Sequence, residues 1–235
     1  RAAMCSDHFT PWSGQQGQSG FAWSWLGAAM AATGLSFGVV NAPGDRYHPA
    51  IVAQAAATLA EMFPGRFWVA LGTGQALSEH ITGAKWPPKP ERNARLQECV
   101  EVIRALWAGE TVTHHGRITI EEAKLYSRPA EPPRIIAPAL SPETAEWAAH
   151  WADGLITINQ PLEKLREIID AFRRGGGDGK PLALQIHVSY AATEDEARRN
   201  AFEQWRTTML PAPVGEDLRT PAQFETAARY IRPDD

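Results

Sequence analysis

The stretch HPAIVAQAAATLAEMFPGRFWVALGTG, residues 48–74, predicts a helix, a strand and a glycine-rich loop in direct succession. Pro49 suits the first turn of a helix, and the alanine-rich run after it stops at Pro64 and Gly65, a pair that interrupts helices. The run RFWVALGTG that follows has the apolar composition of a strand. Strands that alternate with helices of this length are typical of βαβ units and a parallel sheet.

The same alternation continues on both sides of this unit. Six strands are predicted, each followed by a helix or a helical connection, at residues 2–5, 35–43, 66–74, 134–140, 154–158 and 182–191. A small antiparallel hairpin is predicted at residues 111–120, around His115 and Gly116. The predicted class is therefore α/β, with the hairpin as an insertion between units.

Six parallel strands fit either a doubly wound open sheet or part of a barrel. The polar and glycine-rich stretches come directly after the first three strands, at residues 6–12, 41–48 and 72–80. In a barrel, such loops meet at the mouth where catalysis takes place. The position of these loops favours a TIM barrel.

Composition excludes several classes of protein. The net charge of −4 provides no basic surface for nucleic acid, and no apolar run is long enough to span a membrane. The two cysteines, Cys5 and Cys99, form no CxxC motif and are predicted to be reduced. We expect a single domain over residues 1–235, located in the cytoplasm and acting on a small molecule. Because Arg1 is not an initiator methionine and the last residues, RYIRPDD, end without a helix cap or a strand, we also expect that the natural protein is longer at both ends.

Familiar catalytic motifs are absent, but one pair of residues suits acid–base chemistry. The glycine pair Gly72 and Gly74 lacks the third glycine of a dinucleotide-binding loop, since Leu77 occupies that position. No histidine, cysteine or carboxylate spacing indicates a metal site, and no GxSxG motif indicates a serine hydrolase. His8, beside Asp7 at the end of a strand, could act as a general acid or base.

Four stretches, taken in order, resemble the luciferase-like flavin monooxygenase superfamily and its deazaflavin-dependent branch, which contains the coenzyme F420-dependent glucose-6-phosphate dehydrogenases. They are SDHFTPW, the run from Arg46 to Glu79, ERNARLQECVEVIRALWAG and ADGLIT. The resemblance implies a TIM barrel that binds FMN or coenzyme F420 at its mouth, of which this chain would contain strands two to seven of eight. It also implies an oxidoreductase that transfers a hydride between the cofactor and a small substrate, with oxygen as a potential acceptor.

The resemblance also assigns roles to individual positions. His8 would be the catalytic acid or base, and Trp12 would line the substrate side. The predicted cofactor-binding residues are Asp7, Val40, Ala42, Thr73, Gly74, Gln75, Ser78 and Ser141.

Three departures from the family pattern bear on the substrate. Where the sugar-phosphate dehydrogenases have a glutamate after Gly-Thr-Gly, this chain has Gln75, whose amide does not titrate. Leu140 and Ser141 stand in place of paired glycines in the loop that binds the cofactor phosphate, and Gln160 or Pro161 in place of a lysine that binds the substrate phosphate. These departures argue against glucose 6-phosphate as the substrate and leave FMN and coenzyme F420 as alternatives.

Two other functions are compatible with these residues. Gln75 and the altered phosphate loop would also suit a flavin-binding paralogue that has lost its activity. An unrelated hydrolase could use the same barrel, but it would need a nucleophile or a metal site. A homodimer is implied only by analogy with relatives.

Overall fold

The computed structural model describes residues 2–211 and 214–233, which group into two compact units. Unit 1 contains residues 2–7, 22–73 and 87–185. Unit 2 contains residues 8–21, 74–86 and the described residues from 186 onward. The chain passes from one unit to the other at five bonds, those after Asp7, Phe21, Thr73, Trp86 and Gln185. The prediction of a single domain stays a prediction.

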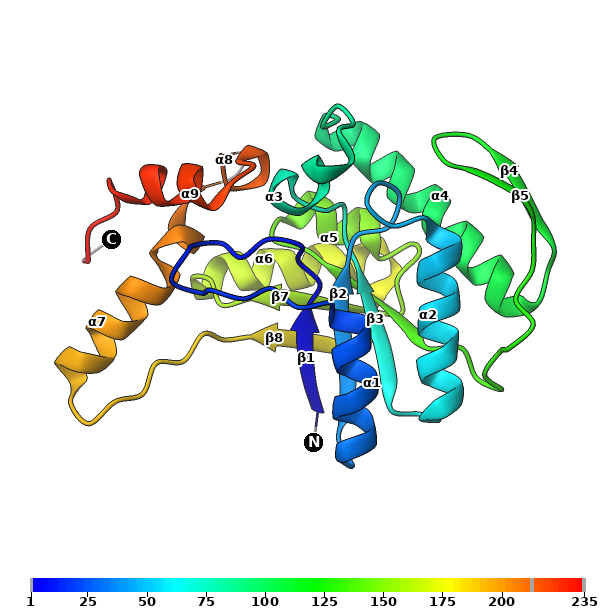
Figure 1. The fold of residues 1–235 in the computed structure, drawn as a ribbon, viewed down its shortest axis with the longest axis horizontal. Helices are drawn as coiled ribbons and strands as arrows, with labels where there is room; N and C mark the ends of the chain where they lie inside the picture. Colours follow the sequence, from blue (N-terminus) through cyan, green and yellow to red (C-terminus); the bar gives the residue numbers. More distant parts are fainter. Residues whose placement is uncertain (1, 212–213, 234–235) are drawn as a thin grey trace. The chain divides into compact units, whose positions relative to one another are not determined.

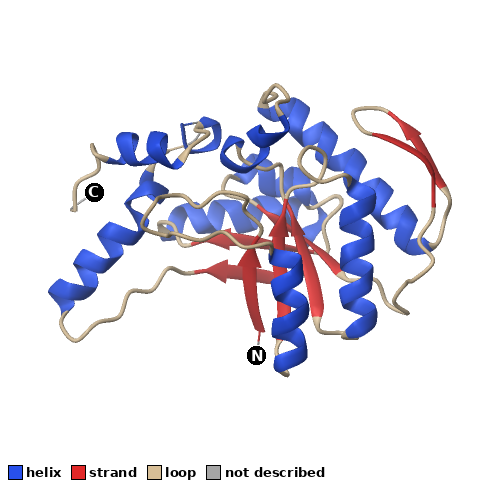
Figure 2. Ribbon diagram, viewed as in Figure 1, coloured by secondary structure: helices blue, strands red, loops and turns tan. Residues whose placement is uncertain are grey.

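A parallel sheet of six strands forms the centre of unit 1, in the order β1-β2-β3-β6-β7-β8 (Figures 1 and 2). A separate antiparallel pair, β4 and β5, is the predicted hairpin, and the strand prediction is confirmed in number and order. The bounds are β1 Ala2–Ser6, β2 Ser36–Asn41, β3 Phe67–Leu71, β4 Val112–His115, β5 Thr119–Ala123, β6 Arg134–Pro138, β7 Gly154–Ile158 and β8 Leu182–Gln185.

The helices of unit 1 follow the strands in the order that the sequence predicts. They are α1 Ala22–Ala32, α2 Pro49–Met62, α4 Lys89–Ala108, α5 Pro142–Ala148 and α6 Leu162–Phe172, which continues into a π-helical turn, η2 Arg173–Gly177. Pro49 begins α2 and Pro142 begins α5, because proline lacks only an N–H that a first helical turn leaves unpaired anyway. Gly109 ends α4 in the left-handed conformation, with φ 90°.

The two faces of the sheet bury different side chains. Outward-facing residues of β2 and β3, such as Val39 and Val69, pack with α1, α2 and α4 in the largest apolar cluster. On the other face, Ala70, Ile136 and Ile156 form a smaller cluster against which Met4, Val40 and Trp68 pack. Helices cover one face and side chains of neighbouring strands fill the other, which is the layering of a barrel wall.

Unit 2 consists of loops and short helices. Its elements are α3 Ala76–Glu79, η1 His80–Thr82, α7 Glu194–Trp205, η3 Arg206–Met209, α8 Val214–Asp217 and α9 Pro221–Ala228. Thr193 caps α7 as the sequence predicts, and Thr220 and Gln223 form a capping box at α9. The strand predicted at residues 182–191 is too long, because β8 ends at Gln185. The residues after it pair with no strand in the described part of the chain.

Candidate active site

The carboxyl ends of β1, β2 and β3 lie along one edge of the sheet in unit 1. The three strands are parallel neighbours, and their register places Ser6 opposite Val40 and Asn41 opposite Leu71. The polar stretches that the sequence singles out begin directly after these ends. Since ligands of such sheets bind beyond the carboxyl ends of the strands, this edge is the candidate site of unit 1.

Asp7 is the centre of a buried polar network at this edge. Its carboxylate, with 1% of the side chain exposed, accepts a hydrogen bond from Asn41 Nδ2 at 2.7 Å and lies 3.5 Å from Arg46 Nη1. Arg46 also donates to the Asp7 carbonyl at 2.8 Å and stacks over the ring of Tyr47, 4.4 Å from its centroid. Burial, and then the nearby Asp7 carboxylate, raises the pKa of Tyr47, so that its phenol stays protonated at neutral pH.

Asn41 contributes an acceptor that none of the described residues uses. The residue is 2% exposed, and its Oδ1 has no hydrogen-bond partner among the described residues. A buried acceptor without a donor is costly, and a bound polar group is one way to satisfy it. The edge around Asp7 and Asn41 therefore fits a ligand with an N–H or O–H donor, a group that the ring and side chain of a flavin-type cofactor provide.

The other predicted cofactor residues of unit 1 have different surroundings. Val40 lies in β2, and Ala42 follows that strand directly. Thr73 Oγ1 accepts a hydrogen bond from Lys89 Nζ at 3.1 Å, which brings a cation to the loop after β3. Ser141 caps α5, since its Oγ accepts from Thr144 N at 3.3 Å. The Ser141 hydroxyl is thus engaged within its own turn.

Unit 2 brings His8 and Ser78 together. His8 Nδ1 lies 3.3 Å from Ser78 Oγ, and the same oxygen accepts a hydrogen bond from the backbone N–H of Phe9 at 3.3 Å. His8 is half-buried and lies beside the ring of Trp12, with 5.4 Å between centroids. The imidazole is therefore held by a hydroxyl on one nitrogen and by an aromatic ring.

The C-terminal helix α9 supports Trp12, a contact that the sequence analysis missed. The ring of Phe224, which is fully buried, meets Trp12 edge-on with 5.0 Å between centroids. Glu225 accepts a hydrogen bond from the backbone N–H of Gly14 at 2.7 Å. No short motif predicts that residues more than 200 positions apart, such as Trp12 and Phe224, are in contact. The only related signal in the sequence is that Phe224 is an apolar residue in an amphipathic helix.

Gly74 and Gln75 begin the other strand-end loop of unit 2. Gly74 has φ 78°, a conformation that favours glycine. Gln75 is the N-cap residue of α3, but its side chain makes no capping hydrogen bond. The amide of Gln75 can hydrogen-bond a ligand but cannot transfer a proton, because it does not titrate.

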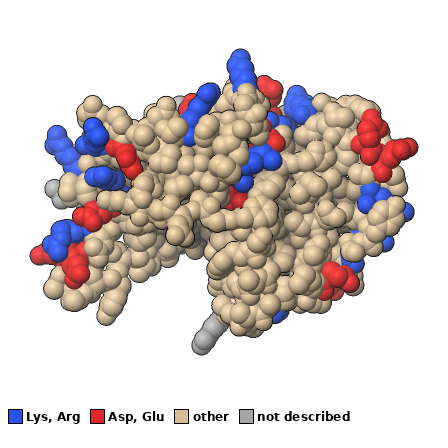
Figure 3. All heavy atoms as spheres, viewed as in Figure 1, with Lys and Arg blue, Asp and Glu red and all other residues tan. Residues whose placement is uncertain are grey.

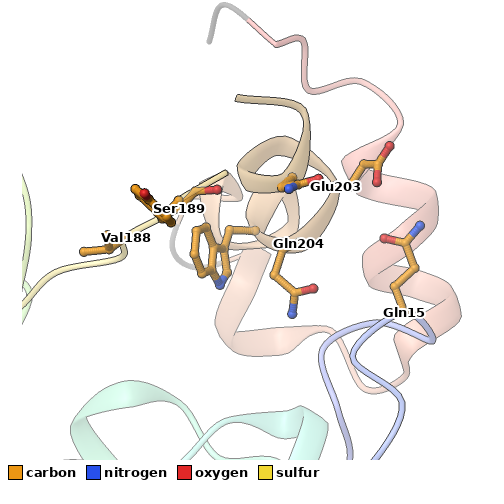
Figure 4. A pocket seen from close by; sticks show the side chains of 8 residues that line it. Gln15, Val188, Ser189, Glu203 and Gln204 are labelled. Carbon is orange, nitrogen blue, oxygen red and sulfur yellow. The ribbon is translucent and has the colours of Figure 1, made fainter. Parts of the chain in front are cut away.

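A hollow on the surface of unit 2 is separate from these residues. It has a volume of about 470 Å³ and is lined by Gln15, the segment from Val188 to Tyr190 and residues of α7 (Figure 4). A second hollow of about 660 Å³ lies in unit 1 between α4 and the region around Trp151. Neither is lined by any of the predicted site residues.

The cysteines do not supply a nucleophile. Both are free thiols; burial, and then the Asp7 carboxylate, raises the pKa of Cys5 to about 11, and burial raises that of Cys99 to about 12. Within residues 2–211 and 214–233, no three histidine, cysteine or carboxylate side chains are grouped as a metal would require. In the same part of the chain, no helix combines the length and the apolar character needed to cross a bilayer.

Comparison with known proteins shows the family to which this chain belongs. The model of the family described as luciferase-like monooxygenase matches residues 1–234. The chain belongs to the luciferase-like monooxygenase family. It is 43% identical to an F420-dependent glucose-6-phosphate dehydrogenase of Nakamurella multipartita, over 100% of this chain and 75% of that protein. It is 36% identical to an F420-dependent hydroxymycolic acid dehydrogenase of Mycobacterium tuberculosis, over 97% of this chain and 64% of that protein.

A solved structure supports the same placement. An F420-dependent secondary alcohol dehydrogenase, in complex with an F420-acetone adduct, superposes with a TM-score of 0.87 and 30% identity, over 98% of this chain and 73% of that one. The predicted α/β fold of the TIM-barrel type is confirmed. The predictions of a luciferase-like oxidoreductase with a flavin-type cofactor are confirmed as well. The family match removes the hydrolase alternative, and none of these relatives is described as an inactive paralogue.

Proposed function

We propose that this luciferase-like protein is an F420-dependent dehydrogenase that interconverts an alcohol and a carbonyl compound. The observation that carries the proposal is the similarity, at 30% identity or more over nearly the whole chain, to proteins named as F420-dependent dehydrogenases. A hydroxyl-bearing substrate is common to the names of all three. FMN in place of coenzyme F420 is the alternative that direct titration distinguishes.

When bound, such a cofactor supplies or accepts a hydride, and the residues of unit 1 hold it. Asn41 Oδ1 offers a buried acceptor to an N–H or O–H of the cofactor, and the network of Asp7 and Arg46 fixes the Asn41 amide. Val40, Ala42 and Thr73 line the same strand ends, and Lys89, which donates to Thr73, brings positive charge. Ser141 contributes through the loop that it caps.

The residues of unit 2 handle the proton and the substrate. His8 removes the proton of the substrate hydroxyl as hydride leaves, or returns it in the reverse direction. Trp12, set by Phe224, gives the substrate an apolar wall. Gly74, Gln75 and Ser78 belong to one loop of unit 2, and Gln75 can act there only through hydrogen bonds.

The substrate we propose is an alcohol without a phosphate group. Gln75 stands where the sugar-phosphate dehydrogenases of this family have a glutamate, and Gln160 or Pro161 stands where they have a lysine. A neutral alcohol requires neither a second acid nor a phosphate-binding cation.

Replacement of His8 by alanine tests the mechanism. We expect turnover to fall by about 10² to 10⁴, the range that general acid–base catalysis contributes, with little change in cofactor affinity. Replacement of the exposed His150 by alanine is the matched control and should leave both quantities unchanged. Turnover in the His8→Ala variant equal to that of the control would remove His8 from the mechanism.

We further propose that the protein is a cytoplasmic homodimer that pairs through the outer face of α1. Helix α1 contains no charged residue, and Trp25 on it is 53% exposed. The surface over α1 shows no lysine, arginine, aspartate or glutamate atoms (Figure 3). Exposed apolar patches of this kind mark interfaces. Light scattering should give a dimer for the protein and for Tyr126→Glu, which changes a 92% exposed aromatic elsewhere, and a monomer for Trp25→Glu.

A further inference from the structure

The hydroxyl of Ser78 contacts both the ring and the backbone of the loop that carries His8. Ser78 is 3% exposed, and its Oγ lies 3.3 Å from His8 Nδ1 and 3.3 Å from the backbone nitrogen of Phe9. Ser19, from the same loop, donates a hydrogen bond to the carbonyl oxygen of His8 rather than to its ring. Ser78 therefore acts on the imidazole itself, and Ser19 acts on the backbone behind it.

We propose that Ser78 is a positioning residue that keeps a proton on Nδ1 of His8, so that Nε2 is the atom that exchanges protons with the substrate. The inference rests on the proposed function in one respect, namely that His8 is the acid or base. It adds which nitrogen reacts and what selects it.

The number of protons and lone pairs on the Ser78 hydroxyl permits this assignment. A serine hydroxyl has one proton to donate and two lone pairs to accept with. The Phe9 N–H takes one lone pair, and the second can accept from Nδ1–H of His8. When the imidazole is doubly protonated, Nδ1 must carry a proton, and Ser78 must accept it. If neutral His8 also keeps the Nδ1 proton, the same hydrogen bond persists through the whole proton-transfer cycle.

The opposite arrangement would require rearrangement at every turnover. If Ser78 donated to an unprotonated Nδ1, protonation of His8 would put two protons on the line between Ser78 Oγ and Nδ1. The hydroxyl would then have to rotate within a site that is 3% exposed, while it still accepts from Phe9. A fixed acceptor removes this rotation. The Trp12 ring, 5.4 Å from the His8 ring, further limits tilting of the imidazole.

Nitrogen NMR of the purified protein labelled with ¹⁵N-histidine tests the tautomer without any ligand. The His8 signals are assigned by their loss in a His8→Gln variant, and spectra are taken about two pH units above the ordinary histidine pKa of ~6.5. We expect the neutral ring to be protonated on Nδ1. In Ser78→Ala, the ratio of the two tautomers should shift by about fivefold toward Nε2–H, as loss of one ordinary hydrogen bond implies.

Two further variants separate the hydroxyl from general disturbance of the loop. Ser78→Thr keeps a hydroxyl and should keep the Nδ1–H tautomer. Ser19→Ala removes a hydroxyl that donates to the His8 carbonyl oxygen, and it should also keep this tautomer. A wild-type His8 protonated on Nε2, or a tautomer ratio that does not change in Ser78→Ala, would overturn the proposal. The proposal would also be overturned if the Nδ1–H tautomer decreased as much in Ser78→Thr as in Ser78→Ala.

Kinetics with coenzyme F420 and an alcohol substrate complete the test. Ser78→Ala should lower kcat by about fivefold while the KM for the alcohol stays unchanged, because the Ser78 hydroxyl contacts the imidazole that transfers the proton and not the alcohol-binding surface. An unchanged kcat in Ser78→Ala would overturn the positioning role. Full turnover in a His8→Ala variant would instead refute the proposed function of His8. The NMR spectra would still decide, independently, whether Ser78 keeps the proton on Nδ1.

Discussion

Gly38 in β2 lies directly opposite Trp68 in β3, and replacement of Gly38 by alanine should destabilise the protein. A Cβ atom at Gly38 would lie 2.0 Å from Cε2 of the Trp68 ring and 2.1 Å from Cζ2. The φ angle of Gly38 is not in the left-handed region, so the backbone itself accepts alanine. The cost of the substitution therefore arises from the ring of Trp68.

The size of the effect follows from the distance. Non-bonded carbon atoms approach to about 3.5 Å, so the ring must move by about 1.5 Å. Trp68 packs against the cluster of Ala70, Ile136 and Ile156, and a ring displaced by this amount loses part of that packing. Overpacking of this kind costs about 1–3 kcal/mol, and we expect a decrease of about 2–3 kcal/mol in the free energy of unfolding.

Urea unfolding of Gly38→Ala and of a matched glycine variant measures this difference. Gly27 lies within α1 with no atom within 4 Å of an added Cβ, so Gly27→Ala should increase stability by about 0.5–1 kcal/mol. In a Trp68→Leu background, Gly38→Ala should cost less than about 0.5 kcal/mol. A loss below about 0.5 kcal/mol in the single variant, or an equal loss in both backgrounds, would refute the steric explanation.

Other features of the two units make separate predictions. Burial raises the pKa of Glu98 in α4, but hydrogen bonds from His114 and Arg117 of the hairpin outweigh it and hold the pKa at about 2, below the ordinary 4.5. The lowered pKa stabilises the fold above pH 4.5 by about 1–2 kcal/mol after allowance for solvent screening. That stability is lost as the pH falls toward 2, and acid titration of Glu98→Gln should lack this loss. Phe224→Ala should cost about 3–5 kcal/mol in thermal unfolding and release Trp12, seen as a change in near-UV circular dichroism; an unchanged Trp12 signal would contradict the packing in unit 2.

Local patterns were sufficient to predict most elements of the fold. The prolines at Pro49 and Pro142 and the threonine cap at Thr193 are signals that act within one helical turn, and the structure has helices at all three. The predicted hairpin is also present. The last strand was predicted too long, because an alternation of apolar and polar residues indicates extended backbone but not whether a neighbouring strand pairs with it.

The candidate site was predictable only in part. His8 and Asp7 stand out because they follow a strand end, but the partners that fix them are distant in sequence. Asn41, which donates to Asp7, and Ser78, which contacts His8, are 34 and 70 residues away from those partners. Such pairings depend on strand register and loop conformation, which local periodicity does not encode. Asn41 carries no motif and was missed altogether.

The measurement that tests the central claim most directly is a side-by-side titration of the purified protein with coenzyme F420 and with FMN, followed by fluorescence. We predict saturable binding of coenzyme F420 that is at least about tenfold tighter than that of FMN, a difference of about 1.4 kcal/mol. Asn41→Leu should weaken it by about tenfold, because the buried acceptor is lost. Binding of FMN alone, or of neither cofactor, would contradict the account.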